Sequence, residues 1–180
     1  MAAYQERPGA DEYREFYAGY VARVPAGDIV EHLRRQLDGT LALVAGLPPA
    51  GADHAYAPGK WTVKQVIGHL SDSERVLSAR AVCFARGEAA PLPPFDEDAY
   101  VAIAGFERRA LDSLIEELRA VRGATVALFD GLSAEAWTRR GTASGHPITV
   151  RALAWIIAGH ELHHRAILEE RYLPAFARQP

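Results

Sequence analysis

The sequence lacks the residues on which many small secreted or metal-binding domains depend. Its 180 residues include a single cysteine, Cys83, which excludes an internal disulfide and a zinc site built from several cysteines. Basic residues (20) do not outnumber acidic ones (23), and the net charge is −3. This balance argues against a protein that binds nucleic acid through a broad basic surface, so we expect no nucleic-acid partner.

Long apolar runs are absent as well. No stretch approaches the ~20 apolar residues that a membrane span needs, and the first residues lack the apolar centre of a secretion signal. We therefore expect a cytoplasmic protein without a membrane partner. Hydrophobic residues still make up 49% of the chain, which is enough to form the core of one domain.

Prolines and glycines divide the chain into four long amphipathic segments. Apolar residues recur every three or four positions in residues 28–46, 62–86, 99–130 and 149–172, which is the period of one helical face. No segment shows the sustained alternation of a strand, so we expect no sheet. The segments predict an all-α four-helix bundle. Its connections of ~12–18 residues exceed the length usual in bundles, which indicates long crossings.

Capping signals mark the starts of these helices. Thr62 and Gln65 match the T-x-x-Q capping box, and Asp28 with Glu31 fits a similar arrangement. Gly123 weakens the third segment by about 1 kcal/mol relative to alanine, which allows a bend or break there. We expect an extension over residues 1–26, the bundle over 27–173 and a tail over 174–180.

Histidines are the informative residues. His160 and His164 are four positions apart, so both project from one face of the fourth helix and interrupt an otherwise apolar stripe. That spacing allows two imidazoles to bind one metal ion. The alternative is a pair of core histidines that are satisfied by hydrogen bonds.

The segment from His160 to His164 also matches H-E-x-x-H, the metalloprotease motif in which Glu161 would act as general base. A metzincin would continue with glycine and histidine where this chain has Ile167 and Glu170. No edge strand for binding a peptide is expected either. We therefore disfavour a protease.

His69 is the strongest candidate for a third ligand, because it lies at the edge of the apolar stripe of the second helix, and a bundle can bring it opposite the fourth. His163 points about 100° away from the neighbouring ligand candidate. Cys83 lies 14 residues beyond His69, about 21 Å along the same helix, and cannot share its ion. The remaining histidines are weaker candidates: His32, His54 and His146.

Four stretches together resemble the DinB/YfiT-like superfamily. They are residues 59–75 (GKWTVKQVIGHLSDSER), 91–100 (PLPPFDEDAY), 141–147 (GTASGHP) and 158–165 (AGHELHHR). The resemblance implies a four-helix bundle with one divalent metal ion, zinc or nickel, on His69, His160 and His164. Many members have glutamine three residues after the last ligand, where this chain has Ile167. Characterised members include transferases of low-molecular-weight thiols and mycothiol-dependent isomerases.

Three neutral imidazoles leave the charge of the ion uncompensated and at least one coordination position open. Such an ion generates hydroxide from water, and it equally stabilises a thiolate. The resemblance favours a metal-dependent enzyme that transfers a low-molecular-weight thiol to an electrophilic small molecule through a metal-bound thiolate. A metal-dependent hydrolase and a non-catalytic bundle that binds a metal or small ligand are the alternatives.

Glu161 is the carboxylate nearest to these ligands in sequence, which makes it a candidate acid or base. A supporting or surface position is the alternative for it. The expected partners are the electrophile and, for a transferase, the thiol. A homodimer is left open, because nothing in the sequence fixes the oligomeric state.

Overall fold

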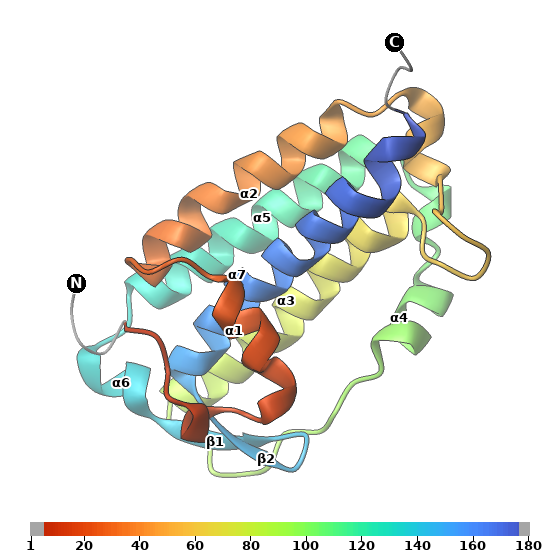
Figure 1. Ribbon diagram of the computed structural model, residues 1–180. Coiled ribbons are helices and arrows are strands. Elements are labelled where there is room, and N and C mark those ends of the chain that lie inside the picture. The colour runs from red at the N-terminus through yellow and green to blue at the C-terminus, as the bar shows by residue number, and fades with distance from the viewer. Residues whose placement is uncertain (1–5, 177–180) are drawn as a thin grey trace.

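The computed structural model describes residues 6–176, and four long helices dominate it (Figure 1). They are α2 (Ile29–Ala45), α3 (Val63–Ala85), α5 (Leu111–Asp130) and α7 (Val150–Ile167). The expected four-helix bundle is confirmed. None of the described helices is long and apolar enough to span a bilayer.

Shorter elements surround the bundle. The α-helices are α1 (Ala18–Arg23), α4 (Glu97–Ala104) and α6 (Ala134–Thr138), and the strands are β1 (Arg140–Ala143) and β2 (His146–Thr149). Single turns of 3-10 helix occupy Ala10–Glu12, Glu15–Tyr17, Pro49–Asp53, Phe106–Arg108 and Leu173–Ala175. A π-helical turn, Leu168–Tyr172, extends α7.

The order of the helices around the bundle explains two of the long connections. α2 packs on α5 and α7, and α3 packs on the same two helices, so α2 lies diagonally opposite α3 and α5 opposite α7 (Figure 1). The chain must therefore cross the end of the bundle between α2 and α3, and again between α5 and α7. A short loop cannot span a diagonal. The arrangement also makes α3 and α7 neighbours, and these two helices carry the histidines.

The cap signals are confirmed at two helix starts. The Thr62 hydroxyl accepts a hydrogen bond from the Gln65 amide, and the Gln65 side chain accepts one from the Thr62 amide, which completes the capping box of α3. Asp28 caps α2, whereas Glu31 pairs with Arg34. These bonds satisfy backbone donors that a helix start leaves unpaired.

The third predicted helix is wrong in its extent. The chain leaves α4 at Gly105, whose φ of 69° lies in the left-handed region, and re-enters a helix only at Leu111. The break falls at Gly105 and not at Gly123, through which α5 continues. Ile103, an apolar residue of the third predicted segment, is 81% exposed. α4 packs against α3 through its other face, on which Val101 is buried.

The expectation of no sheet is also wrong, because β1 and β2 form an antiparallel hairpin. Ser144 and Gly145 make its two-residue turn with φ angles of 53° and 79°, the left-handed pair that a tight hairpin prefers. Strands of four residues are too short to show the alternation that identifies a strand in sequence. The hairpin holds the chain that leads to α4, since Leu92 exchanges backbone hydrogen bonds with Thr142 and Ser144.

The segment before α2 packs against α7 at a glycine. Val21 and Val24 are buried in the core, and a Cβ built on Gly159 would lie 2.0 Å from the backbone oxygen of Tyr20. A side chain at position 159 would therefore displace α1. This close approach places Tyr20 beside His160.

Replacing Gly159 by alanine should accordingly destabilise the protein. We expect a loss of about 2 kcal/mol or more in urea denaturation, because the obstructing atoms are backbone and cannot rotate away. Gly123→Ala is the matched control, since nothing lies within 4 Å of its Cβ position in α5. It should raise stability by about 0.5–1 kcal/mol through helix propensity. Equal effects of the two changes would contradict the packing described here.

Candidate metal centre

The side chains of His69, His160 and His164 converge between α3 and α7. The Nε2 atom of His160 lies 3.0 Å from that of His69 and 3.2 Å from that of His164. His69 and His164 are only 5% and 9% exposed. One potential ligand atom from each residue lies within 4.8 Å of the others. The three residues selected from spacing and resemblance are thus brought together by the fold.

Hydrogen bonding between the rings does not account for this cluster. The Nε2 of a neutral imidazole carries either one hydrogen or one lone pair, so it makes one conventional hydrogen bond. His160 presents this one atom to two neighbours at hydrogen-bond distance. A cation among the three nitrogens satisfies all of them at once.

The distances fit such an ion. Tetrahedral zinc binds histidine nitrogens at about 2.0–2.1 Å, which separates two of its ligand atoms by about 3.3 Å. The two Nε2 contacts of His160 are close to this value. The donor set is three imidazoles without a carboxylate, so a divalent ion would keep its charge and an open position.

The surroundings keep the three rings neutral. Burial, with a smaller effect of the neighbouring His163, lowers the pKa of His69 to about 4. Burial, with smaller effects of His69 and His163, lowers that of His164 to about 3. The pKa of His160 falls well below its usual value, again chiefly through burial. Neutral imidazole is the form that binds metal.

Neighbouring side chains orient the ligands. The Ser73 hydroxyl lies 3.4 Å from Nδ1 of His69, and the Trp61 ring packs against His69 with its centroid 4.6 Å away. Asp72, three residues after His69, forms an ion pair with Arg75 at 3.5 Å. Ser73 is therefore the residue that contacts the second nitrogen of His69.

The other candidates lie elsewhere. His163 faces Tyr20, with ring centroids 5.2 Å apart. His54 packs against the rings of Tyr172 and Phe176. The remaining two histidines and the cysteine also lie outside the triad: exposed His146 in β2, His32 in α2 and half-buried Cys83 in α3.

Glu161 belongs to a buried ion network. Its carboxylate accepts hydrogen bonds from Thr40 (2.6 Å), Gln36 (2.7 Å) and Arg122 (2.8 Å). Arg122 also binds both carboxylate oxygens of Glu74 at 2.8 Å. Because both oxygens of Glu161 already have donors, its contacts favour the supporting role, which the sequence left as the alternative to acid–base catalysis.

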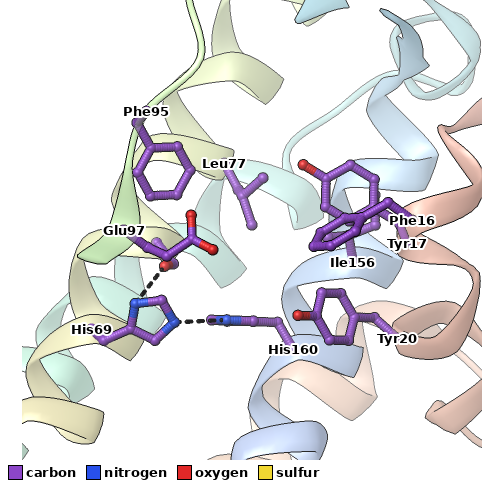
Figure 2. Close-up of a pocket in the computed structure, with 10 residues that line it drawn as sticks. Phe16, Tyr17, Tyr20, His69, Leu77, Phe95, Glu97, Ile156 and His160 are labelled. Carbon is purple, nitrogen blue, oxygen red and sulfur yellow. Dashed lines mark hydrogen bonds between the residues drawn. The ribbon is translucent and has the colours of Figure 1, made fainter. Parts of the chain in front are cut away.

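A cavity of about 60 Å³ opens beside the triad, and we call it the apolar cavity (Figure 2). Its lining is mostly aromatic and aliphatic: Phe16, Tyr17, Tyr20, His69, Ser73, Leu77, Phe95, Glu97, Ile156 and His160.

The Tyr20 hydroxyl and the Glu97 carboxylate point into the apolar cavity from opposite sides (Figure 2). Neither forms a side-chain hydrogen bond with another described residue. Sequence reasoning missed both, because they lie outside the bundle helices and far in sequence from the histidines. The match of residues 91–100 to a family motif was the one signal that included Glu97.

A family model described as the DinB superfamily matches residues 32–168. This chain belongs to the DinB superfamily. A solved structure described as YfiT from Bacillus subtilis, a probable metal-dependent hydrolase with an unusual four-helix bundle topology, superposes with a TM-score of 0.71 at 19% identity. The match covers 99% of this chain and 100% of that one.

A second solved structure is a mycothiol-dependent maleylpyruvate isomerase, with a TM-score of 0.66 and 15% identity over 81% of this chain. This DinB-superfamily chain spans only 61% of the isomerase. Among curated proteins, none matches the sequence significantly. At these identities the structural matches establish the fold, and the metal centre is argued from the chain's own residues.

Removing His69 should nearly abolish metal binding. A supporting residue of a metal site is typically worth 10–100-fold in affinity, so we expect His69→Ala to weaken binding by about 100-fold or more. Competition with a chromophoric chelator measures the change. His163→Ala is the control, since it neighbours a ligand but faces Tyr20. A metalloprotease site on the H-E-x-x-H segment has no role for His69, and stoichiometric metal in folded His69→Ala protein would support it.

Acid should destabilise the metal-free protein. In the unfolded chain His69 binds a proton at pH ~6.5, whereas the folded protein holds its pKa at about 4. Because the unfolded chain takes up the proton first, protonation of His69 favours unfolding. The free energy of unfolding is therefore unaffected by His69 above pH ~6.5 and decreases as the pH falls from there toward 4. Between pH 7 and 5 we expect His69 alone to cost about 2 kcal/mol. Urea denaturation should show a correspondingly smaller acid loss in His69→Gln, and identical losses would contradict burial of a neutral ring.

Proposed function

We propose that this protein is a metal-dependent enzyme that transfers a low-molecular-weight thiol to an electrophilic small molecule, with zinc or nickel on His69, His160 and His164. The observation that carries the proposal is the convergence of three neutral imidazoles beside a cavity. A purely structural ion is normally enclosed by four protein ligands, whereas a catalytic one keeps a position open. The described residues supply three.

The ion, when bound, supplies the positive charge that lowers the pKa of a thiol and holds it as the nucleophilic thiolate. The chain supplies the remainder of the chemistry. In this proposal Glu97 receives the thiol proton, and the Tyr20 hydroxyl donates a hydrogen bond to the atom that gains negative charge, since both line the cavity beside the triad. A sulfur–carbon bond forms, and the bond from that carbon to the leaving group breaks with its electron pair.

The lining of the apolar cavity supports an apolar electrophile. Phe16, Leu77 and Phe95 offer no hydrogen bonds to a strongly hydrated substrate, and they exclude water from the reacting atoms. A thiolate gains nucleophilicity when its hydration is removed. The mycothiol dependence of the structurally similar isomerase is consistent with thiol chemistry on this fold.

A metal-dependent hydrolase is the second candidate, and it rests on the same open position and on the description of the similar YfiT protein. Hydrolysis requires a base that activates water. Glu161 is committed to Arg122, which leaves Glu97 as the carboxylate that lines the apolar cavity. A thiol needs less assistance, since its unperturbed pKa of about 8.5 is far below that of water.

The metal should control thiol transfer. We expect protein reconstituted with zinc or nickel to consume glutathione and a chlorodinitrobenzene at least tenfold faster than the same preparation after chelation. Colorimetric determination of the remaining thiol measures both rates. A hydrolase would instead cleave a nitrophenyl ester without thiol. Equal thiol consumption by metal-free and metal-loaded protein would exclude the proposed transferase.

A further inference from the structure

A second cavity adjoins the triad at His164. It has a volume of about 330 Å³, and we call it the polar cavity; its polar or aromatic lining includes Tyr56, Lys60, Trp61, Asp98, His164 and Tyr172. His164 lines this cavity, whereas His69 and His160 line the apolar one. The three histidines therefore stand between two separate cavities.

The start of α4 divides the two cavities. Glu97 lines the apolar cavity, and Asp98, the next residue, lines the polar one. Consecutive residues in the first turn of a helix project about 100° apart, so one turn serves both spaces. α4 is not one of the four bundle helices, and it packs against α3, which carries His69 (Figure 1).

The charges in the polar cavity have no partners of their own. Neither the Lys60 ammonium nor the Asp98 carboxylate makes an ion pair with another residue among 6–176, and both are exposed to solvent. Such groups are available to a ligand that carries a carboxylate together with an ammonium or hydroxyl group. The Trp61 ring adds an apolar surface that leads to His164.

Size assigns the two cavities to different ligands. A volume of about 330 Å³ is within the usual range for a small-molecule site, whereas about 60 Å³ admits only a small group. A thiol that carries several charged and polar groups does not fit the smaller, apolar space. The electrophilic end of an apolar substrate does.

We propose that the polar cavity binds the body of the thiol substrate, through Lys60 on its carboxylate and Asp98 on an amine or hydroxyl, while the apolar cavity receives the electrophile. The assignment rests on the proposed thiol transfer. The thiol sulfur then reaches the triad from the His164 side, and the electrophilic carbon meets it from the side of His69 and His160. The substrate class is thus a low-molecular-weight thiol with charged groups, and an uncharged thiol lacks the recognition.

Cobalt-substituted protein tests this assignment by binding alone. Glutathione and mercaptoethanol are titrated separately into the cobalt protein, and the sulfur-to-cobalt charge-transfer absorption reports each affinity. Wild-type protein should bind glutathione at least tenfold more tightly than mercaptoethanol. Lys60→Met should reduce the affinity for glutathione by at least tenfold and leave that for mercaptoethanol unchanged. Asp98→Asn should act in the same direction.

Two variants complete the experiment. Arg35→Met removes an exposed positive charge on α2 that lines neither cavity, and it should change neither affinity. Phe95→Ala, in the apolar cavity, should leave glutathione binding unchanged while it raises the KM for chlorodinitrobenzene at least threefold. Circular dichroism verifies the fold of each variant.

The outcomes separate the two proposals. No charge-transfer absorption with either thiol in the wild-type cobalt protein would overturn thiol activation itself, and the cavity assignment with it. Absorption that is insensitive to both Lys60→Met and Asp98→Asn would leave thiol activation in place and overturn the assignment. Loss of glutathione affinity in Phe95→Ala, with none in Lys60→Met, would reverse the two cavities.

Discussion

One buried guanidinium joins all four helices of the bundle. Arg122 in α5 binds Glu74 of α3 through two hydrogen bonds, Glu161 of α7, and the backbone oxygen of Leu33 in α2. Burial alone would lower its pKa, but the adjacent carboxylates outweigh that effect, and the pKa is raised. A buried charge of this kind is costly unless each hydrogen-bonding group has a partner, so it specifies one arrangement of the helices.

The metal centre depends on this arrangement. Glu161 follows His160 directly, so its attachment to Arg122 fixes the rotation of α7 about its own axis. The face of α7 that carries Glu161 is turned toward α2 and α5, and the face that carries His160 and His164 is therefore turned toward α3. Glu74, five residues after His69 in α3, is held by the same guanidinium. The network therefore orients both helices that supply ligands, although it contributes no ligand itself.

Segments outside the four bundle helices supply part of the site. They provide side chains that the bundle helices lack. Tyr20 precedes the first bundle helix, while Phe95 and Glu97 lie between α3 and α5. The bundle helices hold the histidines, and the segments outside the bundle contribute residues to the walls of both cavities.

Local patterns in the sequence were sufficient for the bundle helices, except for the start of the third, and for part of the site. The i,i+4 spacing of His160 and His164 places both rings on one face of any α-helix, whatever surrounds it. The capping box at Thr62 likewise depends only on residues within one turn. His69 could be selected because its own helix presents it near the apolar stripe, and the family resemblance supported the choice.

Tertiary structure alone decided the remainder. The partners of Glu161 lie in α2 and α5, more than 35 residues away in sequence, so its saturation by Arg122, Gln36 and Thr40 has no local signal. The same holds for Tyr20, which reaches His160 only because Gly159 lets two backbones approach closely. Periodicity fixes which residues share a face of one helix. Packing between the helices decides which face of one helix contacts which face of another. The candidate site is formed at those contacts.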